Sequence, residues 1–307
     1  MGGKMVYARI KTSQFFDLIK TEVEARDWIW RSRFNGKDFV CPECGHEKYW
    51  QHKARCEIRE CRSCQHRMRV RAGTLFEKSR IPLLIWLRAI YFVMQGKRGI
   101  SALELKRILS MKSYGTTWTI LHKIRAALKE RDNVYKLKDI IELDGASFGK
   151  RHTGNQADVL VAIETKDFFD DKGKPKSRAG FAKVVVAPET TQSAQAFVDA
   201  AIKPDSMVNT DGAPALTDLK GVDHDYQVMN NEPEKLDHWL PWVHKFISNA
   251  KAWIIGTHHG VEAQYLANYL AEYTYRFNRR HDPDSLFHRA LTACAIAKPK
   301  TARALFG

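Results

Sequence analysis

The chain has 307 residues, of which 44% are hydrophobic and 28% are charged. This balance excludes a disordered or collagen-like protein, and the length suggests about two domains of ~150 residues each. The formal net charge of +15 favours a polyanionic partner such as nucleic acid, although a basic surface that serves only solubility would give the same total.

The basic excess is confined to the first part of the chain. Residues 1–130 contain 27 Lys and Arg against 12 Asp and Glu, whereas residues 131–307 contain 23 of each kind. A basic first part joined to a neutral body is typical of a nucleic-acid-binding module attached to a second functional domain.

The sequence predicts neither export nor membrane insertion. Residues 1–20 contain no continuous apolar stretch, and apolar runs such as residues 81–87 are broken by charge before the ~18–20 residues that a membrane span requires. We expect a soluble, cytoplasmic protein with no membrane partner.

The first predicted element is a helix over residues 12–32, within an N-terminal segment of residues 1–35. Its apolar residues recur at helical spacing and predict one buried face. These residues are Phe15, Leu18, Ile19 and Val23.

Two C-x-x-C pairs follow, Cys41 with Cys44 and Cys61 with Cys64, with sixteen residues between them. This spacing predicts a four-thiolate Zn²⁺ site in a zinc ribbon over residues 36–78. Gly45 follows the first pair, where a positive φ is often needed. A disulfide framework is the alternative, but it requires an oxidising compartment.

Other candidate ligands lie close to these cysteines. Cys56 has no C-x-x-C partner and is expected to be a spare or buried thiol. His46, His52 and His66 are possible substitutes that four cysteines make unnecessary. Because the ribbon is too small to bury its own core, the metal would supply its folding energy.

The end of the ribbon alternates arginine with apolar residues. Arg67, Arg69 and Arg71 alternate with Met68 and Val70. This pattern predicts a strand with one basic face suited to phosphate contact.

A helical DNA-binding module is predicted over residues 79–132. A helix over 82–96 opens with Pro82, and helices over 101–111 and 116–130 are joined by a short gap that contains Gly115, as in a helix-turn-helix. The last of these helices would present polar residues to a major groove, although many helix pairs form only core. These residues are Thr116, Thr117, His122, Lys123 and Arg125.

The second half of the chain predicts an α/β fold. Strands are expected near residues 138–144, 158–166, 181–188, 206–213 and 226–230, with a hairpin loop over 167–178 and helices over 190–203, 235–254 and 261–280. This order gives mixed strand pairing compatible with an RNase H-like catalytic domain over residues 136–281.

Two aspartates, Asp144 and Asp211, each end an apolar strand and precede a glycine. Hard divalent cations need converging oxygen ligands, and adjacent strands can bring two carboxylates together. Asp-Gly is also a common turn dipeptide.

A third ligand is expected from the helix that follows. His244, Ser248 and Lys251 share one helical face, so that an imidazole can bind metal and an ammonium can contact phosphate. An interfacial histidine and a solvated lysine are the alternative. Rival third ligands are Glu232, Glu234 and Asp237.

Together these segments resemble bacterial insertion-sequence transposases of the DDE superfamily, in the group with an N-terminal zinc ribbon and an RNase H-like catalytic domain. The resemblance runs from about residue 12 to residue 281. It rests on the two cysteine pairs and on GTLFEKSRIPLLIWLRAIYFV, ELDGASFGK, VNTDGAPAL, HKFISNAKAWIIGTHHGV and YLAEYTYRFNRRH.

The resemblance implies that Asp144 and Asp211 are the first two catalytic acids. At the third position, seven residues before Lys251, many relatives have glutamate and this chain has His244, so the chain resembles a histidine variant. A nitrogen ligand there weakens the preference for Mg²⁺ and fits Mn²⁺ better. By the same resemblance Glu272 supports the acidic centre.

The resemblance also implies partners and activity. Arg276 and Arg279 would bind DNA, unless they form only the basic face of an amphipathic helix. The activity would be cleavage of terminal inverted repeats and strand transfer, with Mg²⁺ or Mn²⁺ at Asp144, Asp211 and His244, by at least two protomers on DNA. Residues 282–307 would be a C-terminal tail. A regulator derived from a transposase that has lost catalysis, and a nuclease that does not join strands, are the alternatives.

Overall fold

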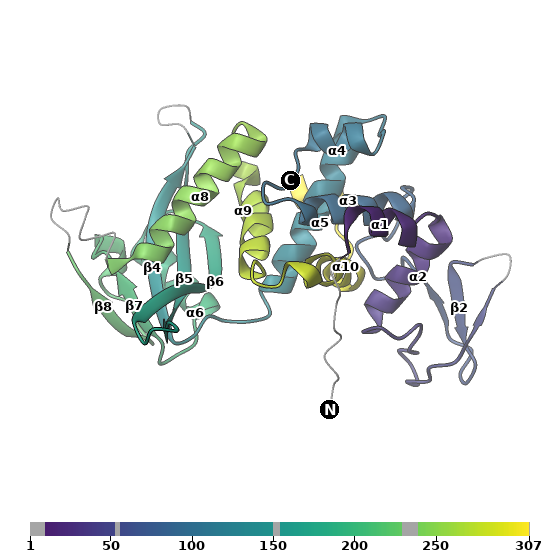
Figure 1. Cartoon of the computed structure of the whole chain (residues 1–307), viewed down its shortest axis with the longest axis horizontal. Helices are drawn as coiled ribbons and strands as arrows, with labels where there is room; N and C mark the ends of the chain where they lie inside the picture. The colour runs from purple at the N-terminus through teal and green to yellow at the C-terminus, as the bar shows by residue number, and fades with distance from the viewer. Residues whose placement is uncertain (1–9, 53–55, 150–153, 229–238, 307) are drawn as a thin grey trace. The chain divides into compact units, whose positions relative to one another are not determined.

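The computed structural model describes residues 10–52, 56–149, 154–228 and 239–306 (Figure 1). The chain divides into two compact units, one formed by the residues up to Arg131 and from Arg279 onward, the other by Asp132–Asn278. Within the described residues, no helix is long and apolar enough to cross a membrane.

The first unit is mainly helical. Its helices are α1 (Thr12–Leu18), α2 (Glu22–Arg33), α3 (Leu83–Gln95), α4 (Ala102–Ile108), α5 (Tyr114–Asp132), α10 (Leu286–Ile296) and α11 (Ala302–Phe306). Helices α2, α3 and α10 pack against one another. Phe15 of α1 stacks on Tyr91 of α3 at 3.9 Å between ring centroids and meets Phe287 of α10 edge-on.

The prediction that residues 282–307 form a tail is therefore wrong. Phe287 and Leu291 of α10 are buried in the first unit, and the carbonyl of Cys294 accepts a hydrogen bond from the amide of Leu75. Helix α10 returns to the N-terminal unit because it packs against α2 and α3, which lie far away in the sequence.

The single helix predicted over residues 12–32 is two helices. Thr21 caps α2: its hydroxyl accepts from the Glu24 amide, and the Glu24 carboxylate accepts from the Thr21 amide. This capping box starts a new helix. Phe15 is buried, as expected from the helical pattern, but Leu18 and Val23 at the break are exposed.

The ribbon forms a three-stranded antiparallel sheet of β1 (Tyr49–Gln51), β2 (Ile58–Cys61) and β3 (Arg67–Arg69), in that order. Among the ribbon residues that the structure describes, the buried cluster consists of Phe39, Cys41 and Cys61, with Tyr49 and Met68 among the partly buried residues packed against it. A cluster this small agrees with the expectation that bound metal supplies part of the folding energy.

The second unit is built on a five-stranded sheet in the order β6-β5-β4-β7-β8. The strands are β4 (Ile140–Phe148), β5 (Ala157–Phe169), β6 (Pro175–Val186), β7 (Met207–Thr210) and β8 (Asp223–Tyr226). The pairs β4–β5 and β5–β6 are antiparallel, whereas β4–β7 and β7–β8 are parallel. This confirms the mixed α/β sheet, and its topology is consistent with an RNase H-like domain.

Helices cover both faces of this sheet. Alternate residues of β5 face opposite sides: Val161 joins the cluster with α8 (Pro241–His258) and α9 (Ala263–Asn278), and Leu160 joins the cluster with α6 (Thr191–Ala201). The β4 residues Leu143 and Phe148 lie in different clusters for the same reason.

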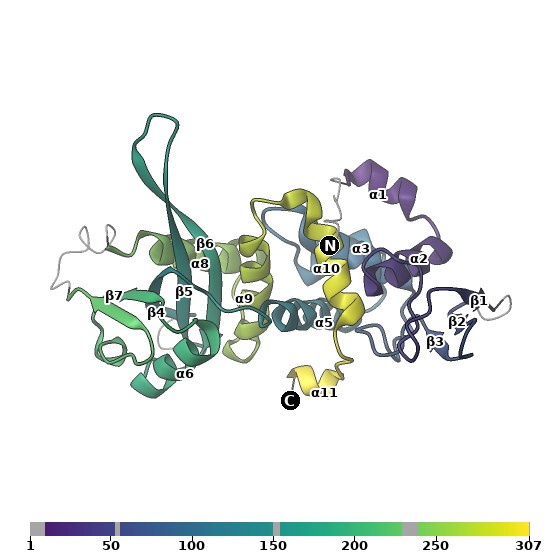
Figure 2. The same ribbon diagram turned by 90° about the horizontal axis from the view of Figure 1, so that it is seen from below.

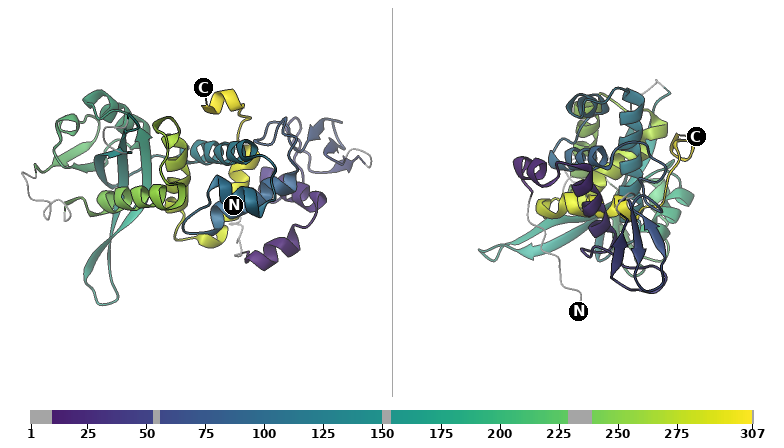
Figure 3. Two further views of the ribbon diagram at one scale, coloured as in Figure 1. Left: turned by 90° about the horizontal axis from the view of Figure 1, so that it is seen from above. Right: turned by 90° about the vertical axis from the view of Figure 1, so that its right-hand side faces the viewer.

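Some predicted boundaries were wrong. Strand β8 begins at Asp223 rather than at residue 226. Strands β5 and β6 continue through most of the segment predicted as a loop, which leaves only residues 170–174 between them. Since β4 pairs with β5 only as far as Thr165, the last β5 residues pair with β6 alone and form a two-stranded arm that extends beyond the sheet (Figure 2; Figure 3).

Candidate active site and metal centre

The sheet register brings Asp144 and Asp211 together. In the parallel pair β4–β7, Glu142 lies opposite Asn209, and Asp144 and Asp211 each lie two residues further along the chain. Strand β7 ends at Thr210, so Asp211 is the first residue beyond it. Asp144, in contrast, lies in the middle of β4 rather than at its end, because β4 continues past β7 along β5.

His244 lies beside Asp144. Its Nε2 atom is 3.2 Å from Oδ2 of Asp144, and the two side chains are 20% and 13% exposed. The imidazole and the carboxylate therefore meet in a largely buried position that still opens to solvent.

Glu142 fixes the helix that carries His244. Its Oε2 atom accepts hydrogen bonds from the amides of Trp242 (2.7 Å) and Val243 (2.8 Å), and its Oε1 atom accepts one from the Thr165 hydroxyl. These amides belong to the first turn of α8, where backbone donors lack partners within the helix and a negative charge is favoured. Glu142 was not predicted, although its place two residues before Asp144 puts it on the same strand face.

Negative charge is concentrated around Asp144 and Asp211. Burial and the nearby charge of Asp144 raise the pKa of the Asp211 carboxyl. Burial and the charges of Asp144, Asp211 and Asp158 raise the pKa of Glu189, which precedes α6 and was also not predicted. A bound divalent cation would relieve this repulsion. The donor set of carboxylate oxygens and one imidazole nitrogen fits Mg²⁺ or Mn²⁺.

Lys251 lies two turns after His244 on α8 and borders a cavity of about 700 Å³. Phe148 of β4 and Leu266 of α9 also line this cavity, and the ammonium nitrogen of Lys251 is 5.4 Å from the Phe148 ring centroid. The positively charged Lys251 side chain therefore lines a cavity that β4, the strand carrying Asp144, also lines.

Other predicted residues of this unit lie elsewhere. Glu272 is fully buried on α9, with Oε1 3.6 Å from Nη1 of Arg276, whose side chain is 10% exposed. Arg276 is mostly covered and its guanidinium faces Glu272, so DNA binding by Arg276 stays an untested prediction. Arg279 is partly exposed. The rival ligands Glu232, Glu234 and Asp237 lie outside the described residues.

The four predicted cysteines form one cluster. The sulfurs of Cys41, Cys44, Cys61 and Cys64 lie within 4.8 Å of one another, with Cys41–Cys64 at 3.4 Å and Cys44–Cys61 at 3.6 Å. Tetrahedral zinc at about 2.3 Å from each sulfur needs similar separations, so the cluster fits a structural zinc ion. Cys56 is exposed and lies outside it.

The two cysteine pairs form matching turns. The amide of Gly45 donates to the Cys41 carbonyl and that of Gln65 to the Cys61 carbonyl. Both residues have positive φ, +72° for Gly45 and +63° for Gln65. The expectation for Gly45 is confirmed, and Gln65 adopts the same left-handed conformation without being glycine.

Metal removal should unfold the ribbon. Replacing Cys61 by serine, or treating the protein with a chelator, should release one zinc ion per chain and abolish the ribbon's protection from proteolysis, because the metal replaces a hydrophobic core. Atomic absorption and limited proteolysis measure this. Cys56→Ser is the matched control, and equal zinc loss in that variant would contradict the assignment.

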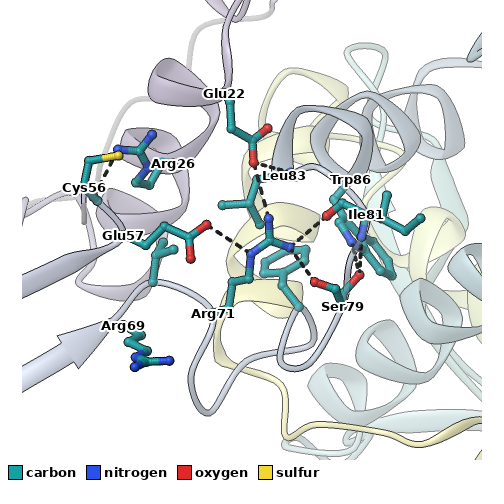
Figure 4. A network of polar contacts seen from close by, with 12 residues as sticks. Glu22, Arg26, Cys56, Glu57, Arg69, Arg71, Ser79, Ile81, Leu83 and Trp86 are labelled. Atoms are coloured by element: carbon teal, nitrogen blue, oxygen red, sulfur yellow. Dashed lines mark hydrogen bonds and ion pairs between the residues drawn. The ribbon is translucent and has the colours of Figure 1, made fainter. Parts of the chain in front are cut away.

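The arginines in and directly after β3 differ in their surroundings. Arg67 and Arg69 are exposed, and Arg67 pairs with Glu60. Arg71 instead donates to the carbonyls of Ser79 and Ile81 and forms ion pairs with Glu22 (3.4 Å) and Glu57 (3.5 Å), whereas Arg69 points away from this network (Figure 4). The guanidinium of Arg71 is thus engaged within the protein, and its predicted contact with DNA stays untested.

Arg71 should instead stabilise the first unit. Arg71→Ala should lower the free energy of unfolding by about 2–4 kcal/mol, because two carbonyls and two carboxylates lose a charged partner. Arg69→Ala should change it by less than ~0.5 kcal/mol. Urea denaturation followed by circular dichroism compares them, and equal effects would show that the network does not stabilise the fold.

The predicted recognition face of α5 is mostly internal. Helix α5 begins at Tyr114, so Gly115 lies within it. Arg125, His122 and Thr117 are buried, and burial, with the charge of Arg125, lowers the pKa of His122 to about 3. The prediction that Arg125 contacts DNA is therefore wrong.

Lys123 is the basic residue of that predicted set that remains partly exposed. Burial lowers the pKa of its ammonium group. A covering contact comes from α11, whose Phe306 stacks on Trp118 at 4.5 Å between ring centroids. The helical pattern showed which residues share a face, but not that the C-terminal segment packs on α5.

The sequence profile of the ISXO2-like transposase domain matches residues 136–278. The match covers almost the whole second unit, including Asp144, Asp211, His244 and Lys251. No curated protein matches the chain. Residues 136–278 therefore match an ISXO2-like transposase domain, and this match supports an insertion-sequence transposase of the DDE superfamily.

Proposed function

We propose that the protein binds the terminal inverted repeats of its insertion sequence and catalyses metal-dependent DNA cleavage and strand transfer. The observation that carries this proposal is the convergence of Asp144, Asp211 and His244 at one place in a transposase domain. Phosphoryl transfer needs positioning and charge neutralisation more than many reacting side chains, and a small constellation of this kind is sufficient for it.

The cleavage step is attack of a water oxygen on the phosphorus at the element end. The bond from phosphorus to the 3′ oxygen breaks, which leaves a 3′-hydroxyl and a 5′-phosphate. In the joining step that 3′-hydroxyl attacks a target phosphodiester and displaces the 3′ oxygen of the target strand. Both steps are in-line displacements, for which the protein must hold the scissile phosphate in one orientation.

Asp144, Asp211 and His244 would hold the divalent cations. When bound, these cations supply activation of the nucleophile and stabilisation of the leaving oxygen. Glu142 orients His244 through the first turn of α8. Lys251 borders an open cavity and can neutralise a phosphate as a point charge. The nitrogen of His244 favours Mn²⁺ more than an all-oxygen site would.

The first unit supplies DNA binding in this proposal. The basic excess of the chain lies in residues 1–130, and phosphate neutralisation dominates affinity for DNA. Among the predicted contacts, Arg67 and Arg69 on the zinc ribbon are exposed and Lys123 on α5 is partly exposed. Arg279 is a further candidate. By resemblance to the family, at least two protomers act together on two element ends.

One observation favours a different function. By the family resemblance, His244 stands where many relatives carry a carboxylate, and loss of that carboxylate is a way to inactivate a transposase. A DNA-binding regulator would keep the zinc ribbon and the helices of the first unit without needing a charged cation site. The retention of Asp144, Asp211 and Lys251 in one domain supports catalysis instead.

Labelled duplexes that carry the repeats flanking the gene test the proposal. With Mn²⁺ or Mg²⁺ the purified protein should nick the 3′ ends of the element and, with target DNA, give joined products. Binding without cleavage in either cation would support the regulator. Cleavage without joining under all conditions would support a nuclease.

A further inference from the structure

The connection between β6 and α6 brings a carboxylate to the strand that carries Asp144. Glu189 lies between Val186, the last residue of β6, and Thr190, the N-cap of α6. Its carboxylate lies over Gly145. A Cβ atom at Gly145 would be 2.2 Å from Oε2 and 3.0 Å from Oε1 of Glu189, so this space is filled by the carboxylate group itself.

Position 145 requires glycine because the Glu189 carboxylate comes close to it, and not because of its backbone conformation. It pairs with Leu160 within the regular part of β4, and it is not among the glycines with positive φ. A glycine inside a strand often marks a place where another group must come close. The absence of a side chain here lets Glu189 reach the strand next to Asp144.

The position of Glu189 is also defined by its charged neighbours. Asp144, Asp211 and Asp158 all act electrostatically on Glu189, although they come from three different strand or loop segments. Glu189 is solvent-accessible, so that a hydrated cation can reach it. The carboxylates of Asp144, Asp211 and Glu189 lie near one another. Among the contacts of the described residues, none of the three forms an ion pair with a Lys or Arg.

The chemistry of the third catalytic position gives Glu189 a role. A carboxylate there would make three negative charges with Asp144 and Asp211, whereas a neutral His244 leaves two. Divalent cations of this type are held mainly by charged oxygen ligands. Glu189 restores the third charge from a different element.

We propose that Glu189 is a further ligand of the catalytic divalent cations and adds a third carboxylate to Asp144 and Asp211. The proposal rests on the cation site of the proposed function and adds a residue to it. Gly145 is a positioning residue in this scheme, because it keeps open the space that the Glu189 carboxylate occupies.

Cation binding can be measured without catalysis. The full-length protein with zinc already bound is titrated with MnCl₂, and free Mn²⁺ is followed by electron paramagnetic resonance. Glu189→Gln should weaken Mn²⁺ binding by roughly ten-fold or more. Gly145→Ala should weaken it similarly, because the new methyl group displaces the end of a flexible side chain and not the backbone.

Asp158→Asn is the matched control for charge. Asp158 acts on Glu189 electrostatically, but its Oδ1 atom is engaged by the Ser147 hydroxyl at 2.7 Å. This variant removes the same charge as Glu189→Gln and should change Mn²⁺ affinity by no more than about two-fold if ligation, rather than bulk charge, is decisive.

The assignment is overturned if Glu189→Gln binds Mn²⁺ like the wild type, or if Asp158→Asn loses as much affinity. Asp144→Asn in the same titration separates this from failure of the proposed function. If Asp144→Asn loses Mn²⁺ and Glu189→Gln does not, only the role of Glu189 falls. If Asp144→Asn also binds normally, the cation site itself is wrongly placed.

Discussion

Replacing Asp144 or Asp211 by asparagine should abolish DNA cleavage, with a fall of roughly 10²–10³-fold or more in the single-turnover rate. Each change replaces a charged oxygen ligand by a neutral amide at the point where β4 and β7 stop pairing, so the site holds divalent cations poorly. DNA binding should be unchanged, because the basic excess lies in residues 1–130. Labelled element ends measure cleavage, and gel shifts measure binding.

Asp205→Asn is the matched control for these two variants. Asp205 is exposed and has a φ of +62°, a conformation that asparagine adopts readily. It should cleave at the wild-type rate. Cleavage at that rate by both Asp144→Asn and Asp211→Asn would show that the catalytic assignment is wrong.

Replacing Glu142 by alanine should cause the second large effect. The Glu142 carboxylate accepts hydrogen bonds from the amides of Trp242 and Val243, which lie two residues and one residue before His244. Its loss should shift α8, and a displacement of about 1 Å in a catalytic group can cost ~10²-fold in rate. The free energy of unfolding should also fall by about 2–4 kcal/mol, because buried donors lose their acceptor.

Glu142→Gln is the informative partner of that variant. An amide oxygen can still accept from both backbone donors, so cleavage should be reduced much less than in Glu142→Ala. Equal loss in the two variants would mean that the charge, rather than the anchoring of α8, matters. Wild-type cleavage by Glu142→Ala would contradict the anchoring role.

The wild type and Glu142→Gln should also differ in how their free energy of unfolding depends on pH. Burial raises the pKa of Glu142 in the folded protein above its unfolded value, so the folded state holds this proton more tightly. Its contribution to stability is therefore present below the unfolded pKa and is lost as the pH rises through the folded pKa. Glu142→Gln should flatten this part of the stability profile, measured by urea denaturation upward from about pH 4.

Local sequence patterns were enough for the zinc cluster and for the meeting of the two aspartates. A C-x-x-C pair folds into a turn by itself, so the spacing of Cys41 and Cys61 from their partners already indicates the cluster. Asp144 and Asp211 follow apolar strand patterns, and two adjacent parallel strands leave few possible registers. His244 and Lys251 share a helical face because the helix period requires it.

Tertiary structure alone decided which arginines are available. Arg67, Arg69 and Arg71 alternate in sequence, but Arg71 reaches Glu22, 49 residues away, and is held there. Arg125 and Arg276 lie on helices with mixed faces, and the packing of other elements buries Arg125 and leaves Arg276 only partly exposed. The periodicity of a helix or strand shows which of its residues share a face, but it does not show which other elements pack on that face.

The same limit explains the two residues that the sequence did not indicate. Glu142 contacts Trp242, which lies 100 residues further along the chain. Glu189 reaches Gly145 because it follows β6, and β6 pairs with β5, the neighbour of β4. Neither contact leaves a periodic or spaced signal in the chain. The sequence by itself indicated the kinds of candidate ligand and the strands that carry them, whereas the packing of distant segments decided which additional carboxylates lie near these candidates.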